Sequence, residues 1–232
     1  MNNAKIVALT QPSARIYEKT DEPDTFRMMS VDEFIAYVAR VSNPSNQNNT
    51  LTAPKLLRYL AKHKHWSPFE MVHVVMEINT TRDIARQILR HRSFTFQEFS
   101  QRYADPTGSL GFSHRDARLQ DTKNRQNSLE AEDRELKSMW LEKQQDIIRS
   151  VNETYTWAVT NGIAKEQARA VLPEGLTNSR MYMAGSLRSW IHYCQLRMGI
   201  ETQKEHREIA TDAWYELTAK FPSLKDSLDI GA

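Results

Sequence analysis

The sequence has 232 residues, enough for one sizeable core, and its 40% hydrophobic and 26% charged residues describe an ordinary globular protein. A formal net charge of +2 is too small to favour a nucleic-acid polymer as partner, whereas the clustering of the basic residues favours a small anionic ligand. The single cysteine, Cys194, excludes an internal disulfide framework and a cysteine-rich metal site.

The N-terminal region predicts a strand followed by a helix. Residues 4–10 are apolar and β-branched, as expected for a strand, and the run is too short for a signal sequence or a membrane span, so we expect a cytoplasmic location. Ser30 and Glu33 have the spacing of a capping box and predict a helix that ends near Ser42. The apolar stripe expected on this helix consists of Phe34, Val38 and Val41.

A second helix, a second strand and a third helix are predicted next. Residues 51–64 have helical periodicity, and residues 72–79 alternate between apolar and other side chains as in a strand. Thr80 or Thr81 then starts a helix that ends close to Arg90.

The most distinctive stretch is Gln87–Tyr103, QILRHRSFTFQEFSQRY, in which Glu98 is the only acid. Arg90 and Arg92 cannot lose their charge, and each offers a planar set of donors suited to phosphate oxygens. Two such residues flanking His91 are costly to bury in a core, so we expect this stretch to face an anion.

The residues after the RHR triplet alternate in character and, if the chain is extended, would face two sides. One side would carry Thr95 and Gln97, and the other would carry Glu98, Ser100 and Arg102. Such a segment could serve two ligands. The alternative is a solvated amphipathic edge strand, which leaves the density of arginines unexplained.

A polar segment and a long helix open the second half of the chain. Residues 104–127 are broken by proline and glycine and are predicted to form a loop or lid. Ser128 is expected to cap a helix that stops at Gly162. The apolar residues expected on this helix are Leu136, Met139, Trp140, Ile147 and Val151.

The C-terminal part predicts a short strand at 181–184 and two helices. Ser186 caps the first, which runs through Arg197, and residues 202–220 form the second. One face of the first helix carries a polar stripe, which either faces a ligand or is simply solvated: Arg188, His192 and Gln195.

The segment RHRSFTFQEFSQR resembles the RHRxxSxNxxSxR signature of the flavin-dependent thymidylate synthases, with Thr95 for the usual serine and Gln97 for the usual asparagine. The resemblance covers most of residues 4–220 apart from the polar segment. His192 and Glu201 differ from the asparagine and the histidine found in related proteins. Further family markers occur in the family's order: A-R-V-S ending at Ser42, H-x-S-P-F-E at His65–Glu70, A-R-x-x-L-P at 168–173 and a Leu-Arg pair ending at Arg197.

The resemblance implies one domain over residues 1–232 with an α+β fold, in which helices flank a central, mostly antiparallel sheet. It implies a homotetramer with active sites shared between subunits, and methylation of dUMP to dTMP with methylenetetrahydrofolate as carbon donor. NADPH would reduce FAD, and the reduced flavin would supply the hydride. The cofactor would carry the redox chemistry, while the protein binds, orients and stabilises charge.

The resemblance also assigns residues to ligands. The expected FAD contacts are Ser42, His65, Ser67, Glu70, Arg90, His91, Arg92, Gln97, Arg188 and His192. The expected dUMP contacts are Gln87, Arg90, Glu98, Ser100, Gln101, Arg102, Arg169 and Arg197. Arg169 would hold the substrate phosphate, often from a neighbouring subunit. Arg197 and Ser100 would be the catalytic residues, with Arg197 stabilising negative charge that builds on the pyrimidine.

Two side chains could in principle act as nucleophiles. Ser100 has no evident histidine–acid pair to activate it, so we expect it to bind phosphate through its hydroxyl and backbone N–H. Cys194 lies in an apolar-flanked helix with no pair of cations to activate it, so we do not expect it to attack the uracil.

The residues alone leave other functions open. The stretch 86–103 could form a nucleic-acid-binding module whose stacking aromatics are Phe94, Phe96, Phe99 and Tyr103. A helical protein–protein adaptor would bind no small molecule tightly. His63, His65 and His73 could ligate zinc, but neither a cysteine nor an H-E-x-x-H motif accompanies them, so no metal is expected. Without the resemblance, Ser42 would merely terminate its helix.

Overall fold

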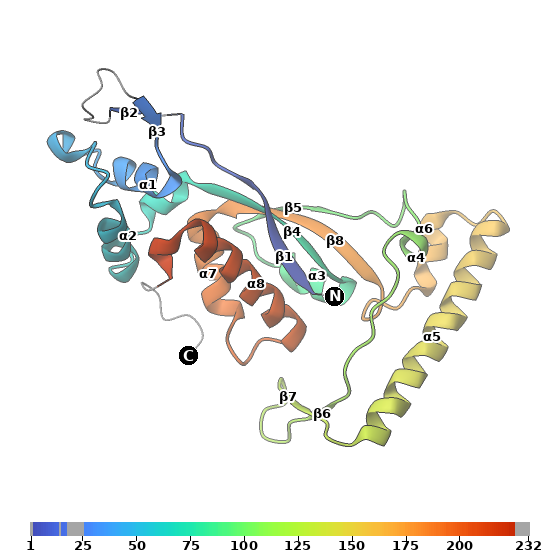
Figure 1. Ribbon diagram of the computed structural model, residues 1–232. Coiled ribbons are helices and arrows are strands. Elements are labelled where there is room, and N and C mark those ends of the chain that lie inside the picture. The colour runs from blue at the N-terminus through green and yellow to red at the C-terminus, as the bar shows by residue number, and fades with distance from the viewer. Residues whose placement is uncertain (1, 14, 18–25, 226–232) are drawn as a thin grey trace.

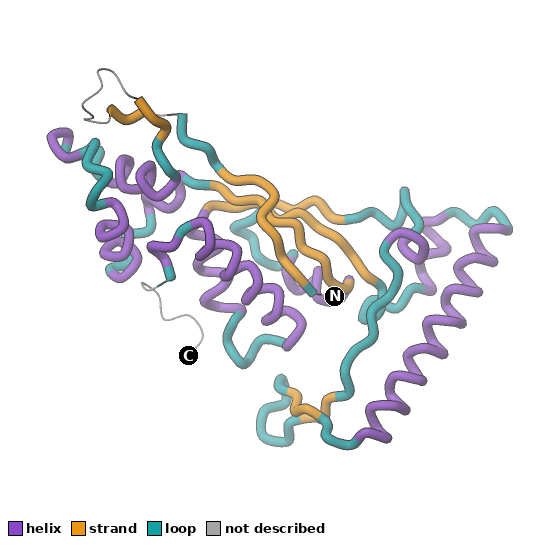
Figure 2. The backbone as a smooth tube through the Cα atoms, viewed as in Figure 1, coloured by secondary structure: helices purple, strands orange, loops and turns teal. Residues whose placement is uncertain are grey.

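The computed structural model describes residues 2–13, 15–17 and 26–225, which form a twisted antiparallel sheet with helices packed beside it (Figures 1 and 2). The sheet has the strand order β1-β4-β8-β5, and each neighbouring pair is antiparallel. Its strands are β1 (Asn3–Leu9), β4 (His73–Thr81), β5 (Thr95–Glu98) and β8 (Asn178–Ser186). The predicted α+β class with a mostly antiparallel sheet is therefore confirmed.

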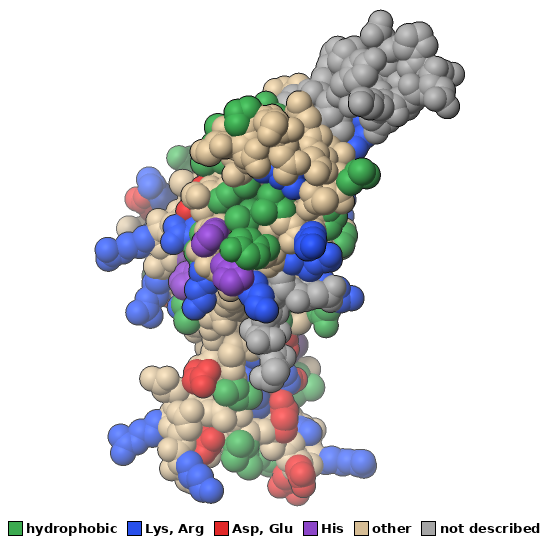
Figure 3. Space-filling model, turned by 90° about the vertical axis from the view of Figure 1, so that its left-hand side faces the viewer, with side chains coloured by type: hydrophobic (Ala, Val, Ile, Leu, Met, Phe, Trp, Pro, Cys, Tyr) green, Lys and Arg blue, Asp and Glu red, His purple; other side chains and the backbone are tan. Residues whose placement is uncertain are grey.

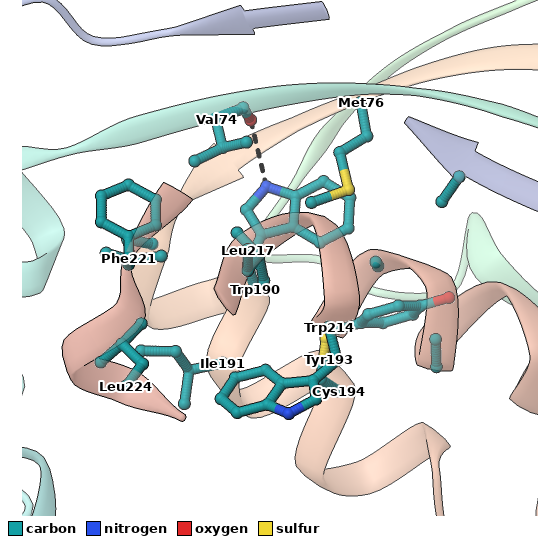
Figure 4. Close-up of a cluster of buried hydrophobic side chains, with 14 of the residues drawn as sticks. Val74, Met76, Trp190, Ile191, Tyr193, Cys194, Trp214, Leu217, Phe221 and Leu224 are labelled. Atoms are coloured by element: carbon teal, nitrogen blue, oxygen red, sulfur yellow. Dashed lines mark hydrogen bonds between the residues drawn. The ribbon is translucent and has the colours of Figure 1, made fainter. Parts of the chain in front are cut away.

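The main core lies between one face of the sheet and two helices, α7 (Leu187–Arg197) and α8 (Lys204–Lys220). Val74, Met76 and Ile78 alternate along β4, as the sequence predicted, and all three are fully buried. Trp190 fills the centre of this core, and its indole Nε1–H donates to the Val74 carbonyl at 3.0 Å (Figure 4). The polar end of a large aromatic side chain is thus satisfied inside an apolar core.

Smaller helices close the ends of this core. They are α1 (Val31–Ala39), α2 (Ala53–Lys62), α3 (Arg82–Ile88) and the 3₁₀ helices η1 (Pro44–Asn46), η2 (Ser67–Met71) and η4 (Pro222–Leu224). Figure 3 shows Lys, Arg and His side chains gathered on the face at the α1 and α2 end. A separate two-stranded ribbon consists of β2 (Arg15–Tyr17) and β3 (Phe26–Met28), which the sequence did not predict.

The opposite end of the molecule is built around α5 (Arg134–Thr160), which stands away from the sheet (Figure 1). Its Tyr155 and Ala158 pack with Ala168 and Leu172 in a second, small cluster of buried residues. The other elements here are α4 (Pro106–Ser109), α6 (Lys165–Ala168), η3 (Arg169–Val171) and a hairpin of β6 (Arg118–Gln120) and β7 (Ser128–Glu130). No helix in the described ranges is both long and apolar enough to cross a membrane.

Residues that commonly begin or end helices predicted several helix boundaries correctly. The capping box of Ser30 and Glu33 forms at α1, Ser186 caps α7 through the Ser189 N–H, and α5 ends just before Gly162, whose φ is 81°. Each of these signals depends on residues within one helical turn of the boundary.

Three predictions about elements were wrong. Ser128 lies in β7, and Asp133 caps α5 instead by accepting from two backbone N–H groups. Residues 104–127 contain α4 and β6 rather than a loop alone. The buried residues of α1 are Ile35 and Ala36, whereas Val41 of the predicted stripe is exposed. In each case tertiary contacts, which the local pattern does not contain, decided the outcome.

Gly185 in β8 allows the Phe94 ring to pack against the sheet. A Cβ atom at Gly185 would lie 2.5 Å from that ring, which is itself held against Trp190 with ring centroids 4.9 Å apart. Gly185→Ala should therefore lower the free energy of unfolding by about 1–3 kcal/mol, the usual cost of overpacking. Urea denaturation would measure it, with Gly175→Ala as matched control because the closest atom there is 3.9 Å away. Equal stability of the two variants would contradict this account.

Candidate active site

The last residue of α7 meets the turn that follows α3. The Arg197 Nε–H donates to His91 Nε2 at 2.9 Å. Burial, and then the charge of Arg197, lower the pKa of His91 to about 4, so the imidazole is neutral and its Nε2 can accept. Arg197 is thereby oriented through Nε, and its two terminal nitrogens have no hydrogen-bond partner among the described residues.

The two outer arginines of the RHR triplet are not neutralised by the protein. Arg90 and Arg92 are exposed, and within the described ranges neither guanidinium pairs with an acid. His91 between them is half-buried and turned toward α7. The two arginines therefore present their charge outward while the histidine faces the interior, and the binding of an anion by this stretch stays a prediction.

Gln87 lies in the last turn of α3 and belongs to a chain of polar side chains. His206 Nδ1 is 3.2 Å from Gln87 Oε1, and His206 Nε2 is 3.1 Å from the Tyr193 hydroxyl. Gln87 Nε2 donates to Gln203 Oε1 at 2.8 Å, and Gln203 Nε2 donates to Glu205 Oε2 at 2.9 Å. We call these five residues the amide relay. His206 is fully buried, and burial lowers its pKa to about 3.

Two arginines from the segment 104–127 hold the far end of the amide relay. Arg115 and Arg118 lie 3.2 Å and 2.5 Å from the Glu205 carboxylate, and Arg115 also pairs with Asp83 at 2.7 Å. Sequence reasoning assigned no chemistry to this segment and missed both arginines, together with Gln203, Glu205 and His206. The sequence feature that could have indicated them is the spacing of Arg115 and Arg118, three residues apart in a polar stretch that glycines interrupt.

Two of the segments expected to bind the flavin, His65–Glu70 and α7, meet at one cleft. Arg188 on α7 forms an ion pair with Glu70 of η2 at 2.7 Å, which fixes the His65–Glu70 segment against α7. The Ser186 hydroxyl and Arg188 together lower the pKa of Glu70. A cleft of about 190 Å³ opens here, lined by Trp66, Ser93, Arg188, Ser189, Ile191, His192 and Gln195. The polar stripe predicted on α7 thus faces this cleft through all three of its members.

Of the ten expected flavin contacts, Arg188 and His192 line this cleft and the other eight do not. Ser42 is exposed in the turn after α1, and His65 and Ser67 are exposed around the start of η2. Gln97 is exposed on β5. His63 and His65 have ring centroids 6.3 Å apart, and among the described residues no group of three His, Cys, Asp or Glu side chains could hold a metal ion.

Strand β5 is an edge strand, with Thr95 and Gln97 exposed and Phe96 packed on the core. The extended conformation ends at Glu98, and residues 101–103 form a turn, so the predicted alternation as far as Arg102 was wrong. Glu98 is engaged within the chain: it accepts from the Ser179 hydroxyl at 2.7 Å and pairs with Arg82 at 3.2 Å.

The turn at residues 100–103, which we call the Ser100 turn, lies next to α6. Arg102 is 3.6 Å from the Glu166 carboxylate, and Lys165 donates to the Tyr103 carbonyl at 3.1 Å. Arg169 follows within one turn, and its Nε–H donates to the Glu166 carbonyl. Arg102 and Arg169 thus both contact Glu166, which puts Arg169 and the Ser100 turn on one side of the same chain.

Cys194 and most of the candidate stacking residues are buried or partly buried. Cys194 is fully buried, and burial raises the pKa of its thiol far above the ordinary value, so a reactive thiolate does not form. Of the aromatics considered for stacking, Phe94 is buried, Phe96 and Phe99 are partly buried and Tyr103 alone is 81% exposed. This arrangement argues against a nucleic-acid-stacking platform.

Comparison with known proteins gives a consistent result. The sequence model of the family described as "Thymidylate synthase complementing protein" matches residues 26–223. A probable flavin-dependent thymidylate synthase of Paramecium bursaria Chlorella virus 1 is 43% identical over 227 residues, which cover 98% of this chain and 99% of that protein. A flavin-dependent thymidylate synthase of Synechocystis sp. is 44% identical over 227 residues, with the same coverage.

A solved structure shares the fold. It is that of the UMP/dUMP methylase PolB from Streptomyces cacaoi bound with 5-Br UMP, which superposes with a TM-score of 0.72 at 21% sequence identity. The superposition covers 96% of this chain and 91% of that one.

Half-buried His91 and buried His206 predict an acid-sensitive fold. In the unfolded chain both would take up protons near pH 6.5, whereas the folded chain resists protonation until about pH 4 at His91 and about pH 3 at His206. The unfolded state therefore binds more protons as the pH falls from about 6.5 to 5, and the free energy of unfolding should fall by up to about 2.7 kcal/mol per pH unit.

Urea denaturation of the protein between about pH 6.5 and 5 would measure this slope. Carboxylates with lowered pKa values affect the free energy of unfolding mainly below about pH 4.5, outside this range. His206→Asn should remove about half of it. A free energy of unfolding that does not change over this range would contradict the neutral state assigned to the two imidazoles.

Proposed function

The chain belongs to the flavin-dependent thymidylate synthases, and on that premise we propose that it methylates dUMP with the carbon of methylenetetrahydrofolate and with NADPH as the reductant. Conversion of dUMP to dTMP with FAD as cofactor follows from membership of the family. The carbon donor, the reductant and the residue roles below are part of the proposal.

The residue assignments rest on one observation. Around the RHR turn, several arginines have no acidic partner among the described residues. Arg90, Arg92 and the terminal nitrogens of Arg197 offer charge-assisted donors that no described acid neutralises. Elsewhere the same chain pairs its arginines with acids, as at Arg82, Arg86 and Arg115. Uncommitted guanidinium groups at one place are suited to anionic ligands, so Arg90 and Arg92 would bind the phosphates of FAD, and Arg197 would face the pyrimidine.

We assign dUMP to two groups of residues, one for its phosphate and one for its pyrimidine. The Ser100 turn and Arg169 would bind the phosphate, through the Ser100 hydroxyl, the Arg102 guanidinium and the Arg169 guanidinium. Gln87 and Arg197 would meet the pyrimidine. Arg197 would stabilise the negative charge that develops on the ring, and because neutral His91 already holds its Nε, the guanidinium is oriented before the substrate arrives. Gln101, 5% exposed with an unpartnered Nε2–H among the described residues, is a further donor for this ligand.

The cleft beside α7 suits part of a flavin nucleotide. Its lining combines an indole, an imidazole, a guanidinium and two hydroxyl groups, which are the donors and ring faces that a flavin and its phosphates require. When bound, FAD carries the redox step, accepting electrons from NADPH and supplying the hydride. Arg188 and His192 would orient it, and Glu70 holds Arg188 in place.

We propose that the active site is completed by a second subunit within a homotetramer. The cleft of about 190 Å³ is smaller than the roughly 300–1,000 Å³ of common ligand pockets, so one chain supplies only part of a dinucleotide site. Large apolar side chains of α5 are exposed, among them Met139 at 52% and Trp157 at 62%. Such an uncovered surface fits contact with another copy. We further propose that residues 1–232 act as one domain and that the enzyme is cytoplasmic.

The function is tested by supplying FAD, NADPH, methylenetetrahydrofolate and dUMP and measuring dTMP. The wild type should bind FAD, oxidise NADPH in a dUMP-stimulated manner and form dTMP. Arg197→Ala should lose about 10²–10³-fold in turnover, the usual effect of removing one electrostatic donor. Cys194→Ala should keep near-wild-type turnover, because the buried thiol is not a nucleophile. Failure of the folded protein to bind FAD would refute the proposal, and loss of turnover in folded Cys194→Ala would restore a cysteine mechanism.

Sharing of the site between subunits is tested by mixing two inactive variants. Figure 1 shows α6, which directly precedes Arg169, beyond one end of the sheet, and α7, which ends at Arg197, beneath the sheet. Arg169→Ala and Arg197→Ala should each be nearly inactive, and the mixture should regain activity after subunit exchange, because some sites then take both arginines intact. Arg169→Ala mixed with Ser100→Ala is the matched control, and it should regain none, since both residues lie on one side of one chain. If exchange is shown independently and neither mixture recovers, each site lies within one chain.

A further inference from the structure

The amide relay fixes the direction of every hydrogen bond in it. A carboxylate only accepts, so the Gln203 amide must turn its nitrogen to Glu205 and its oxygen to Gln87. The Gln87 amide then turns its nitrogen to Gln203 and its oxygen to His206. His206 must therefore carry its proton on Nδ1, and its bare Nε2 accepts from the Tyr193 hydroxyl. Reversing any one member would place two donors or two acceptors face to face.

Glu205 sets the direction of these hydrogen bonds because its carboxylate is kept ionised. It is 6% exposed, and burial opposes its charge, yet Arg115 and the hydrogen bonds to Glu205, including those from Gln203 and Arg118, keep its pKa below the ordinary value. His206 at the other end is fully buried and remains neutral. Burying a carboxylate and an imidazole costs free energy unless each is satisfied. The amide relay gives both groups hydrogen-bond partners. Through it, the carboxylate determines which atom of the Gln87 amide donates and which accepts.

Gln87 keeps one hydrogen-bonding position on each amide atom. Its nitrogen uses one N–H on Gln203 and its oxygen uses one lone pair on His206, so one N–H and one lone pair remain. A free glutamine can rotate its amide by half a turn and exchange donor for acceptor. Gln87 cannot, because both neighbours have a fixed polarity. A ligand therefore meets a donor and an acceptor in one fixed order.

We propose that Glu205 and His206 are positioning residues that lock the Gln87 amide, and that the locked amide makes the site accept uracil and reject cytosine. The proposal rests on the proposed function, in which Gln87 meets the pyrimidine. Uracil presents a carbonyl oxygen where cytosine presents an amino group, and the neighbouring ring nitrogen changes from donor to acceptor. The two bases thus offer reversed patterns, which an amide that cannot rotate distinguishes.

Three variants separate this role from a merely structural one. His206→Leu removes the donor to the Gln87 oxygen, so that only Gln203 still holds the amide in one orientation. His206→Asn places an amide N–H close to the position of Nδ1–H and should restore the lock. In Glu205→Gln an amide nitrogen can replace Oε2 and donate to Gln203, which allows the whole relay to reverse. Glu205→Gln also leaves Arg118 without a carboxylate partner among the described residues. If this variant does not fold, the two His206 variants still test the proposal.

The measurement is kcat/KM for dUMP together with the inhibition constant of dCMP as a competitor. His206→Leu and Glu205→Gln should each reduce the preference for dUMP over dCMP by about tenfold relative to wild type, which is the effect of one hydrogen bond. Both variants should also raise KM for dUMP more than they lower kcat. His206→Asn should recover most of the wild-type preference. NADPH oxidation by the FAD-loaded variants without nucleotide should stay near the wild-type rate.

The outcomes distinguish this inference from the function on which it rests. If wild type forms dTMP, and folded His206→Leu shows a dUMP-to-dCMP preference within twofold of wild type, the positioning role is refuted and the enzyme assignment stands. If His206→Leu and His206→Asn lose the preference equally, His206 has a structural role only. If wild type forms no dTMP, the proposed function itself fails.

Discussion

Strands β4 and β8 pair along 9 residues each, and the register of this pair determines where the proposed ligand contacts lie. Because the pair is antiparallel, α3 leaves β4 at one end of the sheet and α7 leaves β8 at the other. Both helices turn back along the sheet. At about 1.5 Å per residue, the 7 residues of α3 and the 11 of α7 together span about 27 Å, close to the roughly 30 Å of a nine-residue strand. Their C-terminal ends therefore meet, and His91 reaches Arg197.

Sequence patterns predicted most of the elements and the residues of the RHR turn, because these depend on neighbours within one helical turn or on strand alternation. The amide relay could not be predicted in this way. Its hydrogen bonds join residues 119 and 116 positions apart, and no local pattern contains the β4–β8 register that brings them together. The start of α5 shows the same limit, since Ser128 and Asp133 are both good caps and the hairpin of β6 and β7 decides between them.

Neutral imidazoles are what allow so many arginines to gather near one another. A protonated His91 would repel Arg197 at hydrogen-bond distance, and a protonated His206 would add a second buried charge among the same groups. With both rings neutral, His91 can act as an acceptor for Arg197 and His206 can pass a donor to Gln87. The cationic character of the site is thus confined to guanidinium groups, which remain available to an anionic ligand.

The long helix α5 links this site to the question of assembly. It has 27 residues, of which Gln144, Tyr155 and Ala158 are buried in the described chain. Gln144 holds the backbone of Arg115 from both sides, donating to its carbonyl at 3.0 Å and accepting from its N–H at 2.7 Å. Arg115 in turn neutralises Glu205, so the orientation of Gln87 depends on where α5 lies. Because most of α5 is exposed among the described residues, a second subunit packed on its apolar side would also stabilise the amide relay.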